Sequence, residues 1–545
     1  MKFASRIISA APALLLALAL MVTALSCDVP AANMGPVAPV PDIGWTRPVA
    51  RGTFPSLFLS VPAYEHGGFI VNYRPDGTSI NVWPGTTPNS AVTLFGAGAH
   101  NFANASADVR SRGNSTWRYF LKRPLRIRFT AASARPMFGS SYSAANWTLI
   151  ANALDYTLMR TYLAYYMAGL LDSSRVRNNN VQLFFTPMHR MVHLYMAGEY
   201  RGLYLLSDQI DNVRIDLRGH AGLGATPHLA EYLIEWCRHA DTVPTSFWGE
   251  ALVTENDAGG WRIPLPTPGA ATVGGHISNN FEQFFWTNQG IPFEIAFPED
   301  PTFMMGTTDH NTGWLGGTVL IPQSSFPHPP QSGWAFVRDF VNLVERTIRL
   351  GGGFDEAAVR RIIDVPSFVD FYLMHEFFKN HDVAVSSVRF QIRQVPNTPD
   401  WTHSTGATRP KLFAGPIWDF DQSAGGSAGG GRPGWNPGPI GAWAATDNLW
   451  LRYLMGKDWF RAEVRQRWNQ IRNSEVQDML RELERVAVRY QDCFERNFER
   501  WDEKLGRATF RTPSSIVAIP TWRGQVEYLN NWFHQRIIWM DGFLR

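Results

Sequence analysis

The sequence has few cysteines and almost no excess of charge of either sign. It contains three cysteines, Cys27, Cys237 and Cys493, in a chain of 545 residues. With no CxxC pair, zinc ribbons and thioredoxin-type redox sites are excluded, and three cysteines cannot build a disulfide framework. We expect Cys237 and Cys493 either to form one bridge or to stay as two buried thiols. The net charge of +3 is too small for a protein built mainly to hold nucleic acid, so no nucleic-acid partner is expected.

Several catalytic motifs are also absent. There is no GxxxxGK[ST] loop for a nucleotide and no HExxH motif for zinc. Residues 425–429 fit GxSxG literally, but they lie in a glycine tract with no helical pattern behind it, which argues against a nucleophile elbow. Hydrophobic residues make up 45% and charged residues 18% of the chain, a balance typical of a globular protein and not of a disordered one.

The N-terminus has the layout of an export signal. Lys2 and Arg6 precede an apolar run over residues 8–25, which is typical of a secretory signal peptide. The sequence Ala24-Leu25-Ser26-Cys27 looks like a relaxed bacterial lipobox and predicts cleavage before Cys27, with lipidation of that cysteine. Plain secretion or a retained anchor are the alternatives. We therefore expect a cell-envelope protein attached to the membrane through a lipid.

The remaining chain divides into four parts by composition. Residues 28–43 are rich in Pro and Ala and are expected to be a linker. Residues 44–104 have short apolar runs broken by Gly, Pro and Asn, which predicts a β-rich part. Residues 105–441 form the expected core with loop insertions, and residues 442–545 a helical part of the same domain. The predicted fold class is α+β.

Specific elements follow from periodicity. Strands are predicted at 56–61, 68–73, 80–83, 125–129 and 387–393, and a further strand in IPFEIAFPE. A hairpin is predicted over 191–206, with its turn at Ala197-Gly198-Glu199. Helices are predicted at 155–171, 333–350, 366–380, in several segments from Asn448 onward, and at 522–544. The segment KLFAGPIWDFD is predicted to be a strand as well.

The acidic sequence Asp419-Phe420-Asp421 ends that predicted strand. Residues two apart on a strand face the same side, so both carboxylates would project together and Phe420 would pack on the other face. Two carboxylates aimed at one point repel each other unless a cation lies between them, and oxygen ligands suit Mg²⁺. The alternative is structural, with one Asp capping a turn and the other in solvent.

A second acidic residue, Asp382, follows an apolar helix in the sequence Asn380-His381-Asp382. Ser387 comes five residues later and opens a predicted strand. An Asp in a loop, then a short polar side chain, then a metal-binding Asp is the working order of protein kinases. This order alone is weak evidence for a kinase, because a structural role of Asp382 in a turn is at least as likely.

A basic segment lies upstream. Arg110 and Arg112 precede Gly113-Asn114-Ser115, and Lys122 opens the sequence KRPLRIRF. On the predicted strand Arg126 and Arg128 share one face, so the strand would offer an apolar side to the core and a cationic side to an anion. A solvated basic face is the alternative.

These segments together resemble the CotH family of spore-coat-type atypical protein kinases. The resemblance is carried, in order, by RGNSTW, KRPLRIRF, NWTLIANALDYTLMR, GEYRGLYLLSDQI, NHDVAVSSVRF and GPIWDFDQSAG, and it covers most of the chain from about Arg110. It implies a kinase-like fold, a nucleotide site for ATP with Mg²⁺ or Mn²⁺, and phosphotransfer to protein hydroxyls.

The resemblance also assigns residues. Asp382 matches the family's catalytic Asp, Asp419 its metal-binding Asp, and Asp421 a frequent second carboxylate. Lys122 and Arg126 match a basic strand placed near the phosphates, and we group Arg112 with them as nucleotide-binding. The pair formed by Asp155 and Arg160 matches a D…R pair that we expect to be a structural salt bridge.

Two positions depart from the family. Asp208, which we assign to the nucleotide site, stands where many members have Glu, and its shorter side chain is less able to reach a lysine. Ser387, which we assign to the metal site, stands where some members have Asn and others Ser, and Ser is the poorer metal ligand. The leading hypothesis is an exported kinase that phosphorylates Ser or Thr of exported proteins. The alternative is an inactive kinase-like surface protein that binds a protein or glycan.

Overall fold

The structure is a computed structural model, in which residues 40–61, 87–112, 116, 120–138, 140, 143–177, 186–210, 217, 227–236, 254–255, 261–262, 284–287, 289, 291–297, 333–349, 356–384, 387–397, 407–427, 440–501 and 512–544 are described. Cys27, Cys237, the predicted strands at 68–73 and 80–83 and most of the two predicted loop insertions lie outside these residues. Cys493 is a free, buried thiol. None of the described helices is both long and apolar enough to cross a bilayer.

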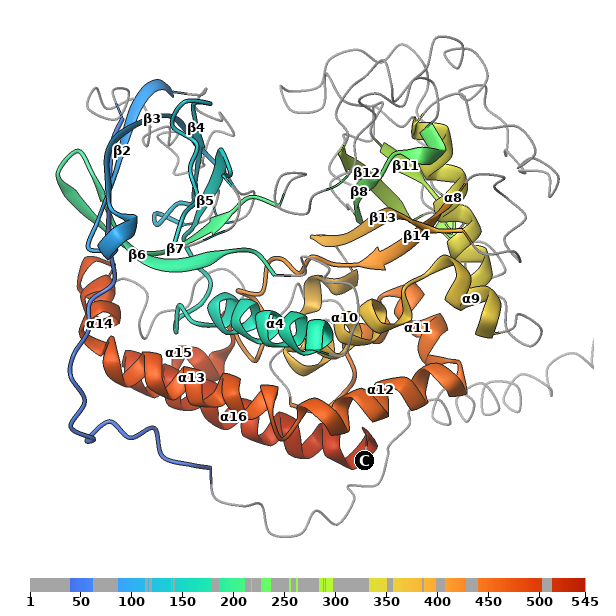
Figure 1. Cartoon of the computed structure of the whole chain (residues 1–545). Helices are drawn as coiled ribbons and strands as arrows, with labels where there is room; N and C mark the ends of the chain where they lie inside the picture. The colour runs from blue at the N-terminus through green and yellow to red at the C-terminus, as the bar shows by residue number, and fades with distance from the viewer. Residues whose placement is uncertain are drawn as a thin grey trace, which may run out of the picture. The chain divides into compact units, whose positions relative to one another are not determined.

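A closed barrel forms the N-terminal part of the fold (Figure 1), with strand order β1-β2-β3-β4-β5-β7-β6. The strands are β1 (Ser56–Ser60), β2 (Thr87–Phe95), β3 (Phe102–Ser111), β4 (Leu125–Phe129), β5 (Asn146–Ile150), β6 (His189–Met196) and β7 (Glu199–Asp208). Alternate side chains of these strands, such as Ile127, Trp147 and Leu149, fill the interior. The basic residues Arg126 and Arg128 therefore face outward, as the alternation in the sequence predicts.

A second sheet has the order β11-β12-β8-β13-β14. Its strands are β8 (Tyr232–Trp236), β11 (Phe284–Trp286), β12 (Pro292–Phe297), β13 (Val388–Pro396) and β14 (Thr408–Ala414), and β9 (Thr254–Glu255) pairs with β10 (Trp261–Arg262) separately. β13 lies antiparallel to both β8 and β14. The start of β13 and the ends of β8 and β14 consequently meet at one edge of the sheet.

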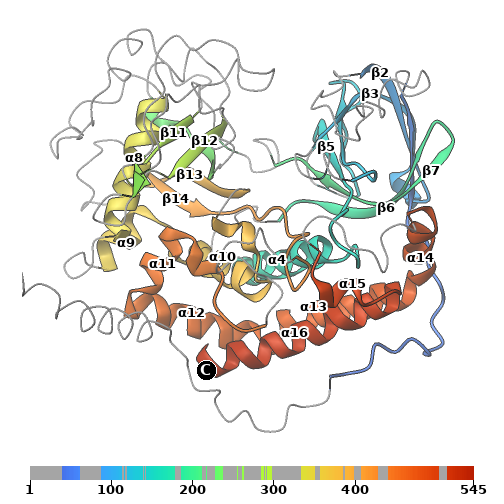
Figure 2. The ribbon, with the colours of Figure 1, turned by 180° about the vertical axis from the view of Figure 1, so that it is seen from behind.

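Helices complete the fold and join the second sheet in one large apolar core. They are α4 (Arg160–Arg177), α8 (Gly333–Arg349), α9 (Glu356–Ile362), α10 (Val365–Phe377), α11 (Leu449–Met455), α12 (Asp458–Ile471), α13 (Glu475–Arg489), α14 (Gln491–Arg500), α15 (Ser514–Val517) and α16 (Trp522–Leu544). α4 packs on α13 and α10, and α14 packs on β7. Figures 1 and 2 show α12, α13 and α16 running beneath α4 and α10 from both sides. The prediction of an α+β fold with a helical C-terminal part is confirmed.

One predicted element is wrong. The strand expected through KLFAGPIWDFD ends at Ala414, and Asp419, Phe420 and Asp421 lie in no strand. The backbone of Asp419 has a φ of +61°, which a strand does not allow. The two carboxylates therefore converge because of a turn, and not because of strand alternation.

Candidate active site

The acidic residues of the candidate site come from loops at one edge of the second sheet. Asp382 lies in a short 3-10 helix, His381–Ala384, that follows α10. Ser387 immediately precedes β13, and Asp419 and Asp421 follow β14. The start of β13 and the end of β14 lie at the same edge of the second sheet. Ser387 and Asp419, which are 32 residues apart in the chain, are therefore brought together.

Hydrogen bonds hold Asp419 in this position. Ser387 Oγ donates to Asp419 Oδ2 at 3.3 Å, and Asn380 Nδ2 donates to the main-chain oxygen of Asp419 at 3.1 Å. Asn380 Oδ1 also accepts from the main-chain nitrogen of Asp382 at 3.2 Å. One buried amide thus ties the loop of Asp382 to the loop of Asp419.

The three carboxylates repel one another electrostatically. The pKa of Asp419 is raised, first by burial and then by the charge of Asp382, while Arg112, Ser387 and Arg389 act in the opposite direction. The pKa of Asp421 is raised well above its usual value, mainly by burial and then by Asp419, Asp382 and Asp155. A cation at this place would relieve that repulsion.

The backbone around these residues is strained. Lys379, Ser387, Asp419 and Ala424 all have positive φ values although none is glycine, and such residues cost of order 1–3 kcal/mol each. Strained residues cluster where surrounding structure holds a functional geometry in place. All four lie in the loops that carry the carboxylates or next to them.

The metal-binding capacity of the site rests on few protein ligands. Across the described parts of the chain, no three His, Cys, Asp or Glu side chains are placed to hold a metal ion together. Mg²⁺ is usually held by one or two carboxylates, with substrate phosphates and water completing its shell. Asp419 and Asp421 supply the hard oxygen donors for such a site, with Ser387 Oγ beside them.

Basic and aromatic residues adjoin the carboxylates. Trp418 directly precedes Asp419, and the guanidinium carbons of Arg112 and Arg389 lie 5.4 Å and 5.1 Å from its ring centroid. Arg389 Nη2 also pairs with Glu235 Oε2 at 2.9 Å. The pKa of Arg112 is lowered, chiefly by burial, even though Asp419 acts to raise it. Arg112, one of the predicted nucleotide-binding residues, belongs to this cluster.

The side chains of Lys122 and Arg126 make other contacts, although the main-chain nitrogen of Arg112 donates to the oxygen of Pro124, two residues from each of them, at 3.3 Å. Lys122 is fully buried, with Nζ donating to the main-chain oxygen of Leu203 at 2.6 Å and lying 4.9 Å from the ring centroid of Tyr204. Arg126 Nη2 donates to Asn146 Oδ1 at 3.0 Å. Arg126 also lines a cavity of about 160 Å³ on the outer side of the barrel, together with Asp108, Arg110 and Arg128.

Asp208 ends β7 in a fully buried position. It acts on the pKa of Tyr165, a residue of α4 that also faces Asp419 and Arg112. Leu203, which holds Lys122, lies five residues earlier on the same strand, and that separation corresponds to about 17 Å. The structure therefore does not bring Asp208 and Lys122 together.

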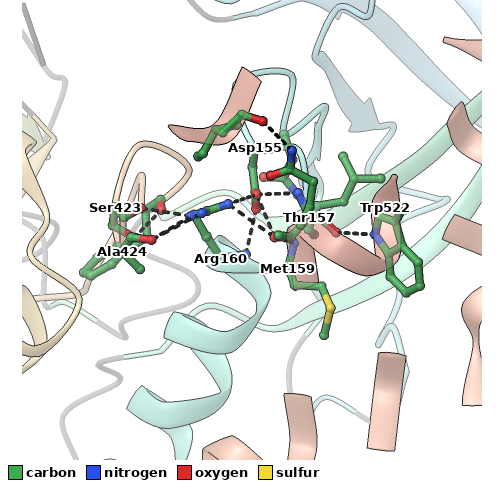
Figure 3. A network of polar contacts seen from close by, with 12 residues as sticks. Asp155, Thr157, Met159, Arg160, Ser423, Ala424 and Trp522 are labelled. Atoms are coloured by element: carbon green, nitrogen blue, oxygen red, sulfur yellow. Dashed lines mark hydrogen bonds and ion pairs between the residues drawn. The ribbon is translucent and has the colours of Figure 1, made fainter. Parts of the chain in front are cut away.

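A buried ion pair fixes the segment that follows Asp421 (Figure 3). Arg160 Nη1 lies 2.5 Å from Asp155 Oδ1, and both side chains are fully buried. Arg160 also donates from Nε to the main-chain oxygen of Ser423 at 2.9 Å and from Nη2 to that of Ala424 at 3.2 Å. The prediction that Asp155 and Arg160 form a structural salt bridge is confirmed.

Gly425 and Gly426 are needed for close packing in the same segment. A Cβ on Gly426 would lie 2.6 Å from Arg160 Nε, and one on Gly425 would lie 2.8 Å from Trp532 Cδ1. Side chains of α4 and α16 therefore occupy the space beside these glycines.

Comparison with known proteins decides the family. The model of the CotH kinase protein family matches residues 109–229 and 330–540, together more than half of the chain. The chain belongs to the CotH kinase protein family. Membership implies an atypical protein kinase that uses ATP. No curated protein matches the chain.

The match covers the residues that form the site. Arg112, Asp155, Asp382 and Asp419 all lie within the matched ranges of the CotH model. The sequence indicated the three aspartates of the site, but it gave no sign of Glu235, Arg389 or Tyr165. Arg389 alternates with the buried Val388 and Phe390, so its outward direction could be read from the sequence, although its neighbours could not.

Proposed function

We propose that this CotH protein is an exported kinase that transfers the terminal phosphoryl group of ATP to Ser or Thr hydroxyls of other exported proteins, with Mg²⁺ or Mn²⁺ required. The observation that supports the proposal is that Asn380 hydrogen-bonds to the main chains of both Asp382 and Asp419 and so joins two loops far apart in the chain. The charge of Asp382 also raises the pKa of Asp419 and of Asp421. Asp382 comes from the loop after a buried helix, which is where kinases place the residue that orients the acceptor.

In this mechanism Asp382 accepts a hydrogen bond from the acceptor hydroxyl and takes its proton. A bond forms between the hydroxyl oxygen and the terminal phosphorus while the bond from that phosphorus to the bridging oxygen breaks, so that ADP leaves. Asp419 and Asp421 would hold the metal ion, whose charge offsets that of the phosphates. Most of the rate gain would come from positioning and fixed charges.

Export is supported by the N-terminal sequence. Lys2, Arg6 and the apolar run over 8–25 favour secretion, and Cys27 favours anchoring through a lipid. The substrates would then be proteins of the cell envelope or beyond it. Growth with labelled palmitate tests the anchor: wild type should be labelled and Cys27→Ala should not.

The kinase activity is tested by incubating the purified protein with labelled ATP and Mg²⁺ or Mn²⁺ and measuring labelled protein by intact mass. Asp382→Ala and Asp419→Ala should each abolish incorporation. Asp458→Ala is the matched control, because that Asp is 96% exposed on α12, and it should leave incorporation unchanged. Wild-type incorporation in either site variant would refute the assignment, and a protein that binds no ATP would favour the inactive binding protein.

A further inference from the structure

Three hydrogen-bond donors from separate elements surround Trp418. Arg112 follows β3, Arg389 lies on β13 and Tyr165 lies on α4. The two guanidinium carbons lie 5.4 Å and 5.1 Å from the indole centroid, and the Tyr165 ring centroid lies 6.0 Å from it. One indole therefore brings together two cations and a phenol directly beside Asp419.

Each of these side chains has donor capacity left over. Arg112 makes no side-chain hydrogen bond or ion pair with the residues that the structure describes. Arg389 uses Nη2 for Glu235, while its Nη1 is buried without a hydrogen-bond partner in the described chain. Tyr165 is fully buried, and its hydroxyl has no partner among the described residues either. A buried donor left unsatisfied costs about 1–3 kcal/mol.

Among the described residues, the two carboxylates nearest to this cluster are already engaged. Glu235 is already engaged by Arg389 and by the main-chain nitrogen of Ser387, the latter at 3.1 Å. Asp419 accepts from Ser387 Oγ. Planar guanidinium groups match the geometry of phosphate oxygens, and hydrogen bonds to a charged oxygen are the strong ones.

We propose that Arg112, Arg389 and Tyr165 form the binding site for the terminal phosphoryl group of ATP, with Trp418 as one wall. This inference rests on the proposed kinase function and adds where the transferred group lies. As the bond to the bridging oxygen breaks, charge spreads over the three outer oxygens of the phosphoryl group. The two guanidinium groups and the hydroxyl stabilise that charge by donating hydrogen bonds to it.

Tyr165→Phe is the sharpest test, because it removes the hydroxyl and leaves the ring against Trp418. Calorimetry with Mg²⁺ should measure the affinity of wild type and variant for ATP and for ADP. We expect the variant to bind ATP about tenfold more weakly, as loss of a hydrogen bond to a charged oxygen predicts, with ADP affinity nearly unchanged. Arg112→Gln should show the same pattern with a larger loss, and it serves as the second variant should Tyr165→Phe fail to fold.

Tyr372→Phe is the matched control. Tyr372 is a fully buried tyrosine on α10, and the charges that act on its pKa are those of Glu376 and Arg536, both on helices. That variant should keep both affinities. If wild type binds ATP and both site variants keep its preference for ATP over ADP, the inference is overturned and the kinase proposal stands. If wild type binds neither nucleotide, the kinase proposal fails, and this inference fails with it.

Discussion

Asn380 Nδ2 donates a hydrogen bond of 3.1 Å to the main-chain oxygen of Asp419. The bond joins the loop after α10 to the loop after β14, and it constrains a residue whose φ of +61° is unfavourable for an L-amino acid. The same side chain accepts from the main chain of Asp382. The relative position of two acidic residues is thus set by one amide.

Asn380→Ala should therefore weaken both the fold and the activity. The fully buried amide loses two hydrogen bonds, and the groups left behind are desolvated, so we expect the free energy of unfolding to fall by about 2 kcal/mol. Phosphotransfer should fall at least tenfold, which labelled ATP would measure alongside urea unfolding. Gln466→Ala, at an exposed position of α12, is the control and should change neither. A stable, fully active Asn380→Ala protein would show that the amide has no positioning role.

Gly426→Ala should destabilise the protein, because the new Cβ would press on Arg160 Nε and, at 2.8 Å, on the main-chain oxygen of Ser423. Overpacking of this kind costs about 1–3 kcal/mol. Gly542→Ala is the opposite case, since a Cβ there meets nothing within 4 Å and lies in α16. It should raise the free energy of unfolding by about 0.5–1 kcal/mol. Equal stability of both variants would contradict the packing described for Gly426.

His375→Leu should remove part of the protein's sensitivity to acid. His375 is buried between Phe371 and Phe420, and its ring nitrogens have no hydrogen-bond partner among the described residues. Burial lowers the pKa of His375 from 6.5 to about 3. Between these values the unfolded chain binds a proton that the folded protein does not, so stability falls as pH drops through that window.

The slope from one such group is about 1.4 kcal/mol per pH unit. Urea unfolding at pH 6.5 and pH 5 should therefore show wild type losing about 2 kcal/mol more than His375→Leu. Replacing the exposed His100 by Gln should leave the wild-type loss in place. The same pH dependence in wild type and His375→Leu would mean that His375 does not resist protonation.

The sequence predicted most secondary structure because periodicity is local. The strand at 125–129 and the helix at 522–544 lie where their patterns placed them, and Phe420 is fully buried as expected. The helix expected from Asp155 begins instead at Arg160, because the Asp155 carboxylate accepts from the main-chain nitrogens of Thr157 and Arg160 and caps the helix.

The site was predictable in its acidic residues but not in its neighbours. The dipeptide Gly415-Pro416 is a turn signal that could have ended the predicted strand before Asp419. No local pattern could reveal that Arg112, Tyr165 and Arg389 meet at Trp418, because that meeting depends on how the barrel, α4 and the second sheet pack. The resemblance to CotH proteins placed Lys122 and Arg126 near the phosphates, and that stays a prediction; their side chains hydrogen-bond to Leu203 and Asn146.

The last helix, α16, hydrogen-bonds to two segments that adjoin the acidic loops. Trp522 Nε1 donates to the main-chain oxygen of Thr157, beside the Asp155 and Arg160 pair, and Arg536 Nη2 lies 2.5 Å from Glu376 Oε1, four residues before Asn380. Both contacts come from one helix, so a protein cut before Trp522 would lose them together while keeping all three aspartates. We expect the acidic loops of such a protein to lose their fixed positions.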